Sequence, residues 1–278
     1  MVSLLSDPVQ SVLTDIARLC VWLAGLAVVF MPLERLLAVR ASRFPRKGIG
    51  ADLGWYFINS LLPAALLSVP MALLAWVAHS VVPHSVHSAI AGMPFWARAL
   101  AALAAGEIGV YWGHRWSHEI PALWRFHALH HSAETVDFMV NTRAHPVDMV
   151  FGRLSGAVPI HILGLAGPED VAGATMPLLI TLFCMVWSFF IHANLRLDFG
   201  PLAWAISTPR FHHWHHTLAP PVNRNYASML PVLDVVFGTF HLPKGEWPRA
   251  YGIAEPMPGG LFEQLAQPLA PRTPPIEA

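Results

Sequence analysis

The chain has 278 residues, of which 55% are hydrophobic and only 12% are charged, about half the charged fraction of an ordinary soluble protein. Its 17 Lys and Arg balance its 17 Asp and Glu, so it lacks the net positive charge of a typical nucleic-acid-binding protein. The mean hydropathy of +0.48 indicates a membrane protein. Both cysteines, Cys20 and Cys184, lie in apolar runs, which excludes a disulfide framework and a cysteine-rich zinc site.

Four apolar stretches are long enough to cross a bilayer, which takes roughly 20 residues per helix. They cover residues 12–38, 53–82, 95–112 and 171–191. A weaker stretch, residues 147–165, could be a full span, a re-entrant half-helix or an interfacial helix. The short turn GLAGPED joins it to the fourth span, which favours a helical hairpin. The alternative, buried helices of a soluble all-α protein, fits poorly with so little charge in such long stretches.

The loops between these stretches predict the orientation of the chain. Residues 40–47, RASRFPRK, contain four basic residues, whereas the next loop, VPHSVHSAIAGMP, contains no Lys or Arg. The positive-inside rule therefore places residues 40–47 in the cytoplasm, together with residues 113–146 and 192–278. The expected fold is an all-α integral membrane protein with about four transmembrane helices, a hairpin and a cytoplasmic helical cap rich in histidine.

Three histidine clusters fall in the predicted cytoplasmic segments. In a helix, residues three or four apart lie on one face, which is the spacing that two imidazoles need to bind one metal. The sequences GHRWSHE, FHALHH and FHHWHH all have this spacing. They supply eight candidate ligands: His114, His118, His127, His130, His131, His212, His215 and His216.

Two further histidines stand at the predicted membrane edge, and the hairpin would bring His145 and His192 close together there. Eight to ten imidazoles exceed the four or so ligands of one structural zinc and fit two metal ions. Imidazole accepts Zn, Cu, Fe or Ni, so the ligands alone do not identify the metal. His213 falls on a different helical face. Isolated histidines are expected not to bind metal: His79, His84, His87, His161 and His241.

The order and spacing of these boxes resemble the fatty acid hydroxylase superfamily, which includes sterol desaturases, sphingolipid hydroxylases and alkylglycerol monooxygenase. The similarity covers about residues 107–242 and includes HRWSH, HALHH, HHWHH, RAHP and NYASMLPVLDVVFGTF. It implies a di-iron oxidase that uses O₂, with the eight clustered histidines, His192 and His145 as ligands. Zinc could replace iron in purified material. No fused cytochrome-like segment is visible, so a separate ferredoxin- or cytochrome-like protein is expected to supply electrons.

On this basis the chain divides into N-terminal transmembrane helices (1–92), a catalytic domain (93–242) and an irregular tail (243–278). Glu107, an ionisable residue within a span, is a tentative catalytic residue; the alternative is a buried Glu paired with a neighbouring helix. Arg143 and Arg210 are interpreted as positive-inside anchors. The expected reaction is hydroxylation of a lipid drawn from the bilayer. Desaturation, ether-lipid oxidation and non-catalytic metal binding or transport remain as alternatives.

Overall fold

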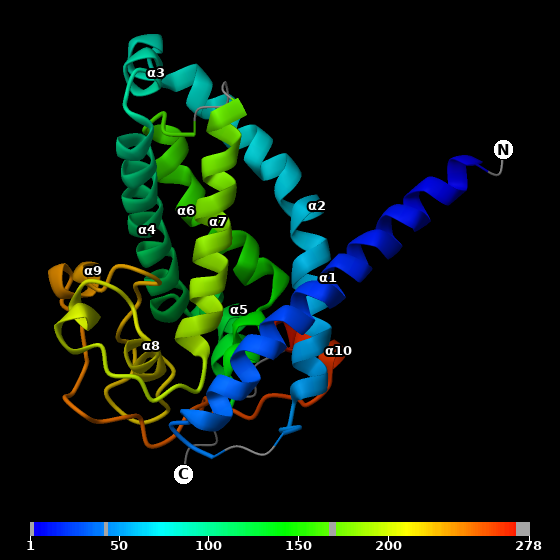
Figure 1. Cartoon of the computed structure of the whole chain (residues 1–278), viewed down its shortest axis with the longest axis vertical. Coiled ribbons are helices and arrows are strands. Elements are labelled where there is room, and N and C mark those ends of the chain that lie inside the picture. Colours follow the sequence, from blue (N-terminus) through cyan, green and yellow to red (C-terminus); the bar gives the residue numbers. More distant parts are fainter. Residues whose placement is uncertain (1–2, 42–43, 167–170, 271–278) are drawn as a thin grey trace.

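The computed structural model describes residues 3–41, 44–166 and 171–270. The described residues form helices and irregular connections with no β-strand, apart from one isolated bridge between Thr217 and Tyr251. The all-α expectation is therefore confirmed. Figure 1 shows a bundle of long helices with short helices and loops gathered around one end.

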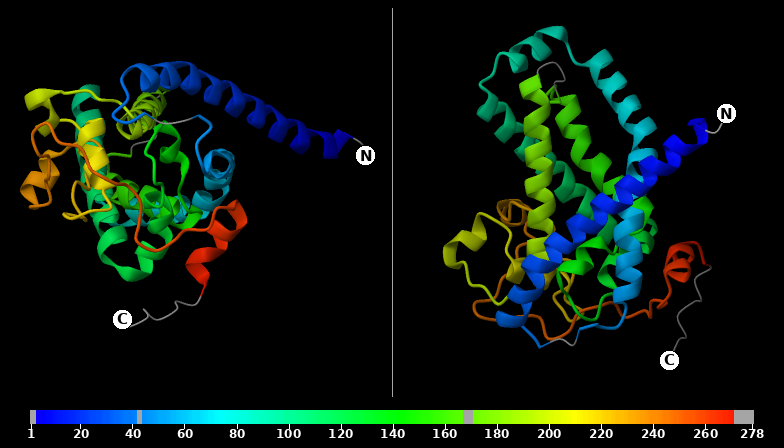
Figure 2. Two further views of the ribbon diagram at one scale, coloured as in Figure 1. Left: turned by 90° about the horizontal axis from the view of Figure 1, so that it is seen from below. Right: turned by 45° about the vertical axis from the view of Figure 1, so that its right-hand side comes forward.

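Two N-terminal helices, α1 (Ser3–Leu36) and α2 (Ile49–Val81), are joined by the basic loop. Among the described helices, these two are long and apolar enough to cross a membrane, over Val9–Leu36 and Ile49–Val81. The N-terminal part of α1 diverges from the bundle in both views of Figure 2. Most apolar side chains of residues 9–36 of α1 are exposed, as expected for a helix that has lipid as its solvent.

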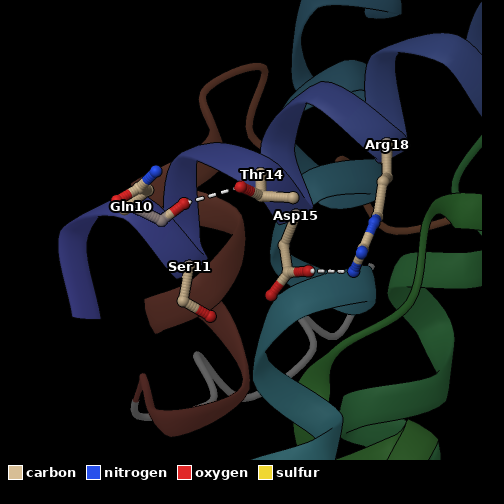
Figure 3. A pocket seen from close by; sticks show the side chains of 5 residues that line it. All are labelled: Gln10, Ser11, Thr14, Asp15 and Arg18. Atoms are coloured by element: carbon tan, nitrogen blue, oxygen red, sulfur yellow. Dashed lines mark hydrogen bonds and ion pairs between the residues drawn. The ribbon is translucent and has the colours of Figure 1, made fainter. Parts of the chain in front are cut away.

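A hollow on this part of α1 is lined by residues of a single helix (Figure 3). Its polar groups bond one another: Thr14 donates to the carbonyl oxygen of Gln10, and Arg18 pairs with Asp15 at 3.2 Å. The hollow is thus a local feature of one helix surface, far along the chain from the histidines.

The loop expected between the second and third spans contains a short helix, α3 (His84–Ala91). Pro83, which cannot continue a preceding helix, ends α2 and begins this turn. Gly92 and Pro94 then separate α3 from α4 (Phe95–Glu119). The turn lies at the end of the bundle opposite the histidine-rich segments (Figure 1).

The centre of the bundle is the contact between α4 and α6 (Pro146–Ile162). Small residues let the two backbones approach closely. A Cβ atom added to Gly109 would lie 2.1 Å from the carbonyl oxygen of Ser155, and one added to Gly113 would lie 2.4 Å from its hydroxyl. Close approach through small residues is the usual way in which membrane helices pack. This contact fixes the position of α4, which extends past its predicted span and carries His114 and His118 on its last turns.

Helix α6 and helix α7 (Val171–His192) form where the two arms of the predicted hairpin were expected, but α6 packs against α4 and α2 rather than against α7. Residues 167–170, between the two helices, lie outside the described residues. The segment just before α6 and the last residue of α7 both contact His130. Its Nδ1 lies 3.1 Å from the carbonyl oxygen of Arg143, and its Nε2 lies 3.2 Å from Nε2 of His192. The weak stretch therefore forms a helix, but the expected meeting of His145 with His192 does not occur, because His145 bonds the carbonyl oxygen of Leu265 instead.

Short helices complete this end of the bundle. They are α5 (Pro121–His131), η1 (Phe138–Thr142), η2 (Gly200–Trp204), α8 (Pro209–His215) and α9 (Val232–Val236). Helix α8 begins with Pro209 in its first turn, and the side chain of Thr208 accepts a hydrogen bond from the backbone N–H of Phe211. This cap starts the helix just before its histidines.

The expectation of an irregular tail is wrong for part of residues 243–270, which contain α10 (Leu261–Ala266) and η3 (Gln267–Leu269). Leu261 packs against Gly54 of α2, and the buried Gln264 accepts a hydrogen bond from the indole of Trp55 at 2.7 Å. Apolar burial and this buried bond order the segment in spite of its Pro and Gly content. Residues 271–278 lie outside the described residues.

Candidate metal centre

Nine histidines from four elements meet at one end of the bundle. Helix α4 supplies two, α5 supplies three, α7 ends on one, and three come from α8 and its C-cap. They form two groups, and within each group the potential ligand atoms all lie within 4.8 Å of one another. The five-histidine group consists of His114, His118, His127, His131 and His215, and the four-histidine group of His130, His192, His212 and His216.

The two groups adjoin each other. His131 of the five-histidine group stacks on His216 of the four-histidine group with ring centroids 4.4 Å apart. In the four-histidine group the Nε2 atoms face one another, with His192 Nε2 lying 2.9 Å from that of His212 and 3.2 Å from that of His130. The four-histidine group is buried, whereas His114 and His118 of the other group are partly exposed.

Hydrogen bonds on the outer side of the rings decide which nitrogen carries the proton. In six of the nine rings, Nδ1 lies 2.7–3.2 Å from an oxygen that can only accept. The acceptors are the carbonyl oxygens of Arg143, Ser188, Arg224 and Tyr226, the amide oxygen of Asn223 and the carboxylate of Asp148. Nδ1 must therefore donate, which leaves the Nε2 lone pair directed inward.

The inward nitrogens are arranged as they would be around a bound cation. Two buried ones, Nε2 of His118 and Nε2 of His215, have no hydrogen-bond partner among the described residues, although an unpaired buried polar atom is costly. Burial lowers the pKa of both His114 and His130 to about 3, so these rings are neutral and available as ligands at neutral pH. Neutral imidazoles with converging lone pairs and acceptor-bound Nδ1–H groups are a donor set that fits two transition-metal ions.

Three of the outer acceptors belong to one segment, residues 223–226, here called the acceptor loop. The side-chain oxygen of Asn223 accepts a hydrogen bond from Nδ1 of His118. The carbonyl oxygen of Arg224 accepts from Nδ1 of His215, and that of Tyr226 accepts from Nδ1 of His114. Asn223 and Asn225 have positive φ angles of 58° and 60°, which Asn tolerates better than most residues. This tight backbone turns several acceptors toward the five-histidine group.

Glu107 does not face the converging nitrogens. It is 6% exposed, and its carboxylate accepts hydrogen bonds from the hydroxyl of Ser228 and from the backbone N–H groups of Met229 and Leu230. The structure thus places Glu107 against the segment that follows the acceptor loop, where it holds backbone donors. Both of its oxygens are engaged there.

His145 lies outside both histidine groups. Its Nδ1 accepts from the backbone N–H of Val147 and caps α6, while Nε2 donates to the carbonyl oxygen of Leu265 at 3.2 Å. His213 also lies outside the groups. Its Nε2 donates to the carbonyl oxygens of His192 and Ala193, and its Nδ1 accepts from the hydroxyl of Tyr251. His192, in contrast, belongs to the four-histidine group.

The anchor interpretation is wrong for Arg143, which is 6% exposed and pairs through Nε with Asp52 at 2.6 Å. Asp52 also pairs with Arg46 of the basic loop, and Arg46 in turn pairs with Asp137. Arg210 is likewise buried. The charges of Arg46 and Arg143 are satisfied inside the protein by Asp52 and Asp137, because burying an arginine requires a carboxylate beside it. Arg210 instead lies 3.7 Å from the carboxylate of the exposed Asp198.

The region that contains the grouped histidines is also the region that is similar to a known protein family. The fatty acid hydroxylase family model matches residues 99–239, about half of the chain, and this region contains all nine grouped histidines. The chain belongs to the fatty acid hydroxylase family. No solved structure matches this family member significantly.

Curated relatives of this fatty acid hydroxylase family member include three kinds of enzyme. Ornithine lipid hydroxylase OlsE of Rhizobium tropici is 35% identical over 73% of this chain and 59% of its own length. Alkylglycerol monooxygenase of Danio rerio is 33% identical over 56% of this chain and 32% of its own length. A very-long-chain aldehyde decarbonylase of Oryza sativa subsp. indica is 29% identical over 53% of this chain and 25% of its own length. The matches thus span less than two thirds of each relative.

Sequence reasoning missed most of the outer acceptors in this family member. The segment NYASML was recognised, but a backbone carbonyl such as that of Tyr226 leaves no signature in a sequence. The sequence does offer Asp148 as one of several carboxylates that could orient an imidazole, but not its partner; it lies two residues into α6, and its carboxylate is 3.0 Å from Nδ1 of His127. A carboxylate behind a metal-binding imidazole is a common arrangement.

Proposed function

We propose that this protein is a membrane-bound di-iron oxygenase that hydroxylates a C–H bond of a lipid. The observation that carries the proposal is the convergence of nine imidazoles in two adjoining groups with outer Nδ1–H donors. Membership of the fatty acid hydroxylase family supports the reaction class. Bound iron would supply the O₂-dependent oxidation that no ordinary side chain can perform.

The protein's own residues would hold the metals and exclude water from them. The four-histidine group is buried under α5, α7 and α8, and its neutral rings provide nitrogen ligands without bringing negative charge. The catalytic domain would cover residues 93–242. The ordered contacts of Arg46 and Asp52 with Asp137 and Arg143 indicate that residues before 93 contribute to its support.

We place the histidine end on the cytoplasmic side of four transmembrane helices formed by α1, α2, α4 and α7. The basic loop lies at that same end, since the backbone N–H of Arg40 bonds to the side chain of Asn194, two residues after His192. Basic residues favour the cytoplasmic side. The grouped histidines would then lie just beyond the inner membrane surface, within reach of a lipid entering from the bilayer.

The substrate class follows from the relatives' names. Two relatives are named as an ornithine lipid hydroxylase and an alkylglycerol monooxygenase, so we propose a lipid of one of these two classes as the substrate. Electrons would come from a separate ferredoxin- or cytochrome-like protein. The ether-lipid reaction is the second candidate, since alkylglycerol monooxygenases of several animals match about half of the chain.

The test combines metal analysis with lipid analysis. The purified full chain should hold two irons and consume O₂ with a reductant, and cells expressing it should contain a lipid that has gained one oxygen atom. His130→Ala and His215→Ala should lower metal content and abolish turnover, whereas His84→Ala, at the opposite end of the bundle, should do neither. An alkene product would indicate desaturation instead. Stoichiometric zinc with no O₂ consumption under any reductant would indicate metal binding or transport.

A further inference from the structure

We infer that each of the two metal sites is supported by its own network of hydrogen-bonded residues, here called a scaffold. A different buried aspartate anchors each scaffold: Asp234 for the five-histidine group and Asp52 for the four-histidine group. Both would be positioning residues that act through backbone acceptors. This inference rests on the proposed pair of metals.

Asp234 is fully buried and holds the acceptor loop from behind. One carboxylate oxygen accepts from the backbone N–H of Tyr226 at 2.7 Å, and the other accepts from that of Ala227 at 2.9 Å. The carbonyl group of this same Tyr226 accepts Nδ1–H of His114. The backbone of Tyr226 therefore connects Asp234 to the imidazole of His114, whose Nε2 is directed toward the metal site.

The Asp234 scaffold also reaches the helix that carries His114. The hydroxyl of Thr239 donates to Asp234 at 2.7 Å and lies 2.8 Å from the hydroxyl of Tyr111, which is three residues before His114 on α4. Both His114 and the carbonyl that orients it are thus tied to a single carboxylate. A shift of Asp234 would change the direction of the ring nitrogen, and ligand direction is what a metal ion selects.

Asp52 plays the corresponding part for the other group. It is fully buried and pairs with Arg143 at 2.6 Å and with Arg46 at 2.7 Å, while its carbonyl oxygen accepts from the hydroxyl of Thr142. These bonds fix the backbone at residues 142–143. The carbonyl group of Arg143 accepts Nδ1–H of His130, a member of the four-histidine group.

The two scaffolds have no residue in common. The first joins the loop after α8 to α4, and the second joins the start of α2 to the segment after η1. Substitution of Asn at either aspartate replaces an acceptor oxygen with an amide N–H₂ that would face existing donors. Because the two scaffolds share no hydrogen-bond partner, each substitution should mainly weaken the binding of the metal in its own group.

The experiment measures metal per full-length protein after dialysis in metal-buffered solution. Wild type should retain two metals, and Asp234→Asn and Asp52→Asn should each retain one, with about a 10–100-fold loss of affinity for the other. Asp15→Asn, at an exposed aspartate of α1, is the matched control and should retain two.

Double variants identify which metal is lost. Asp234→Asn combined with His118→Ala should still hold one metal, because both changes act on the five-histidine group, whereas Asp234→Asn with His212→Ala should hold none. Asp52→Asn should give the reverse pattern. Loss of both metals in either single variant, or of neither, overturns the inference and leaves the di-metal function standing. Fewer than two metals in the wild type would overturn the di-metal function, and this inference with it.

Discussion

Nδ1 of His114 lies 2.7 Å from the backbone carbonyl oxygen of Tyr226, while the hydroxyl of that tyrosine is buried and has no hydrogen-bond partner among the described residues. The part of Tyr226 that supports the metal-directed ring is therefore its main chain. Its side chain packs beside His118 with ring centroids 5.3 Å apart.

Tyr226→Phe should consequently retain the full metal content of the wild type. Removal of an unsatisfied buried hydroxyl loses no bond and relieves a desolvation cost, so the free energy of unfolding should stay the same or rise by up to about 1–3 kcal/mol. Metal analysis and thermal unfolding of the variant beside wild type check this. A loss of metal in Tyr226→Phe would mean that the hydroxyl itself takes part in the site.

His145→Asn should leave metal content unchanged, because the ring caps α6 and Asn is a good N-cap residue. The same variant tests a pH dependence. Burial lowers the pKa of His145 from its usual value of 6.5, so the unfolded chain binds this proton more readily than the folded chain. Stability from the neutral ring is present above pH 6.5 and is lost as the pH falls below it.

Thermal unfolding between pH 7.5 and pH 5 measures this effect, with the range set about the ordinary histidine pKa of roughly 6.5. Wild type should lose more stability over this interval than His145→Asn, which has no proton to bind at that position. Equal losses in the two proteins would show that His145 does not titrate as its environment implies, and a drop in metal content would restore it as a candidate ligand.

Glu107→Gln should destabilise the protein by no more than about 1 kcal/mol, because the Gln oxygen can accept from the backbone N–H groups of Met229 and Leu230 while its amide donates to the hydroxyl of Ser228. Turnover per folded, metal-loaded molecule should remain close to that of wild type, since both carboxylate oxygens already bond Ser228 and its neighbours. The measurements are thermal unfolding and kcat normalised to metal content. A kcat reduced by orders of magnitude at unchanged stability would return Glu107 to a catalytic role.

Gly109→Ala should separate α4 from α6. The added methyl group would lie 2.1 Å from a backbone oxygen of Ser155, and main-chain atoms cannot move aside cheaply. We expect a loss of about 1–3 kcal/mol or more. Gly152→Ala, on α6 with nothing within 4 Å of the new atom, is the control and should be tolerated. Equal thermal stability of the two variants would contradict the close contact described here.

The sequence contained enough to predict the long helices and, among the ten ligand candidates, the nine that fall in the two groups, but not α3, α10 or the place of His145. Helical spacing at His127, His130 and His131 and the hydropathy of the long stretches depend on local order, which the chain records directly. Which histidine joins which group was not predictable, because His130 and His131 are neighbours in the chain and yet belong to different groups. The division depends on how α5 packs against α7 and α8, a tertiary property.

The supporting residues were the least predictable part. Arg143 seemed to be a surface anchor until Asp52, 91 residues away, proved to be its partner. The tail seemed irregular because Pro and Gly dominate its composition, yet Gln264 finds a buried partner on α2. In each case the deciding contact joins segments that are remote in sequence, and composition carries no information about such pairs.

The acceptor loop offers two main-chain oxygens, those of Arg224 and Tyr226, to the rings of His215 and His114. Exchange of the side chain at position 224 leaves its oxygen in place, so many residue types should be compatible with an intact centre. Insertion or deletion of a single residue would shift both oxygens out of register with the rings at once. At this point of the chain, length is under stricter constraint than residue identity.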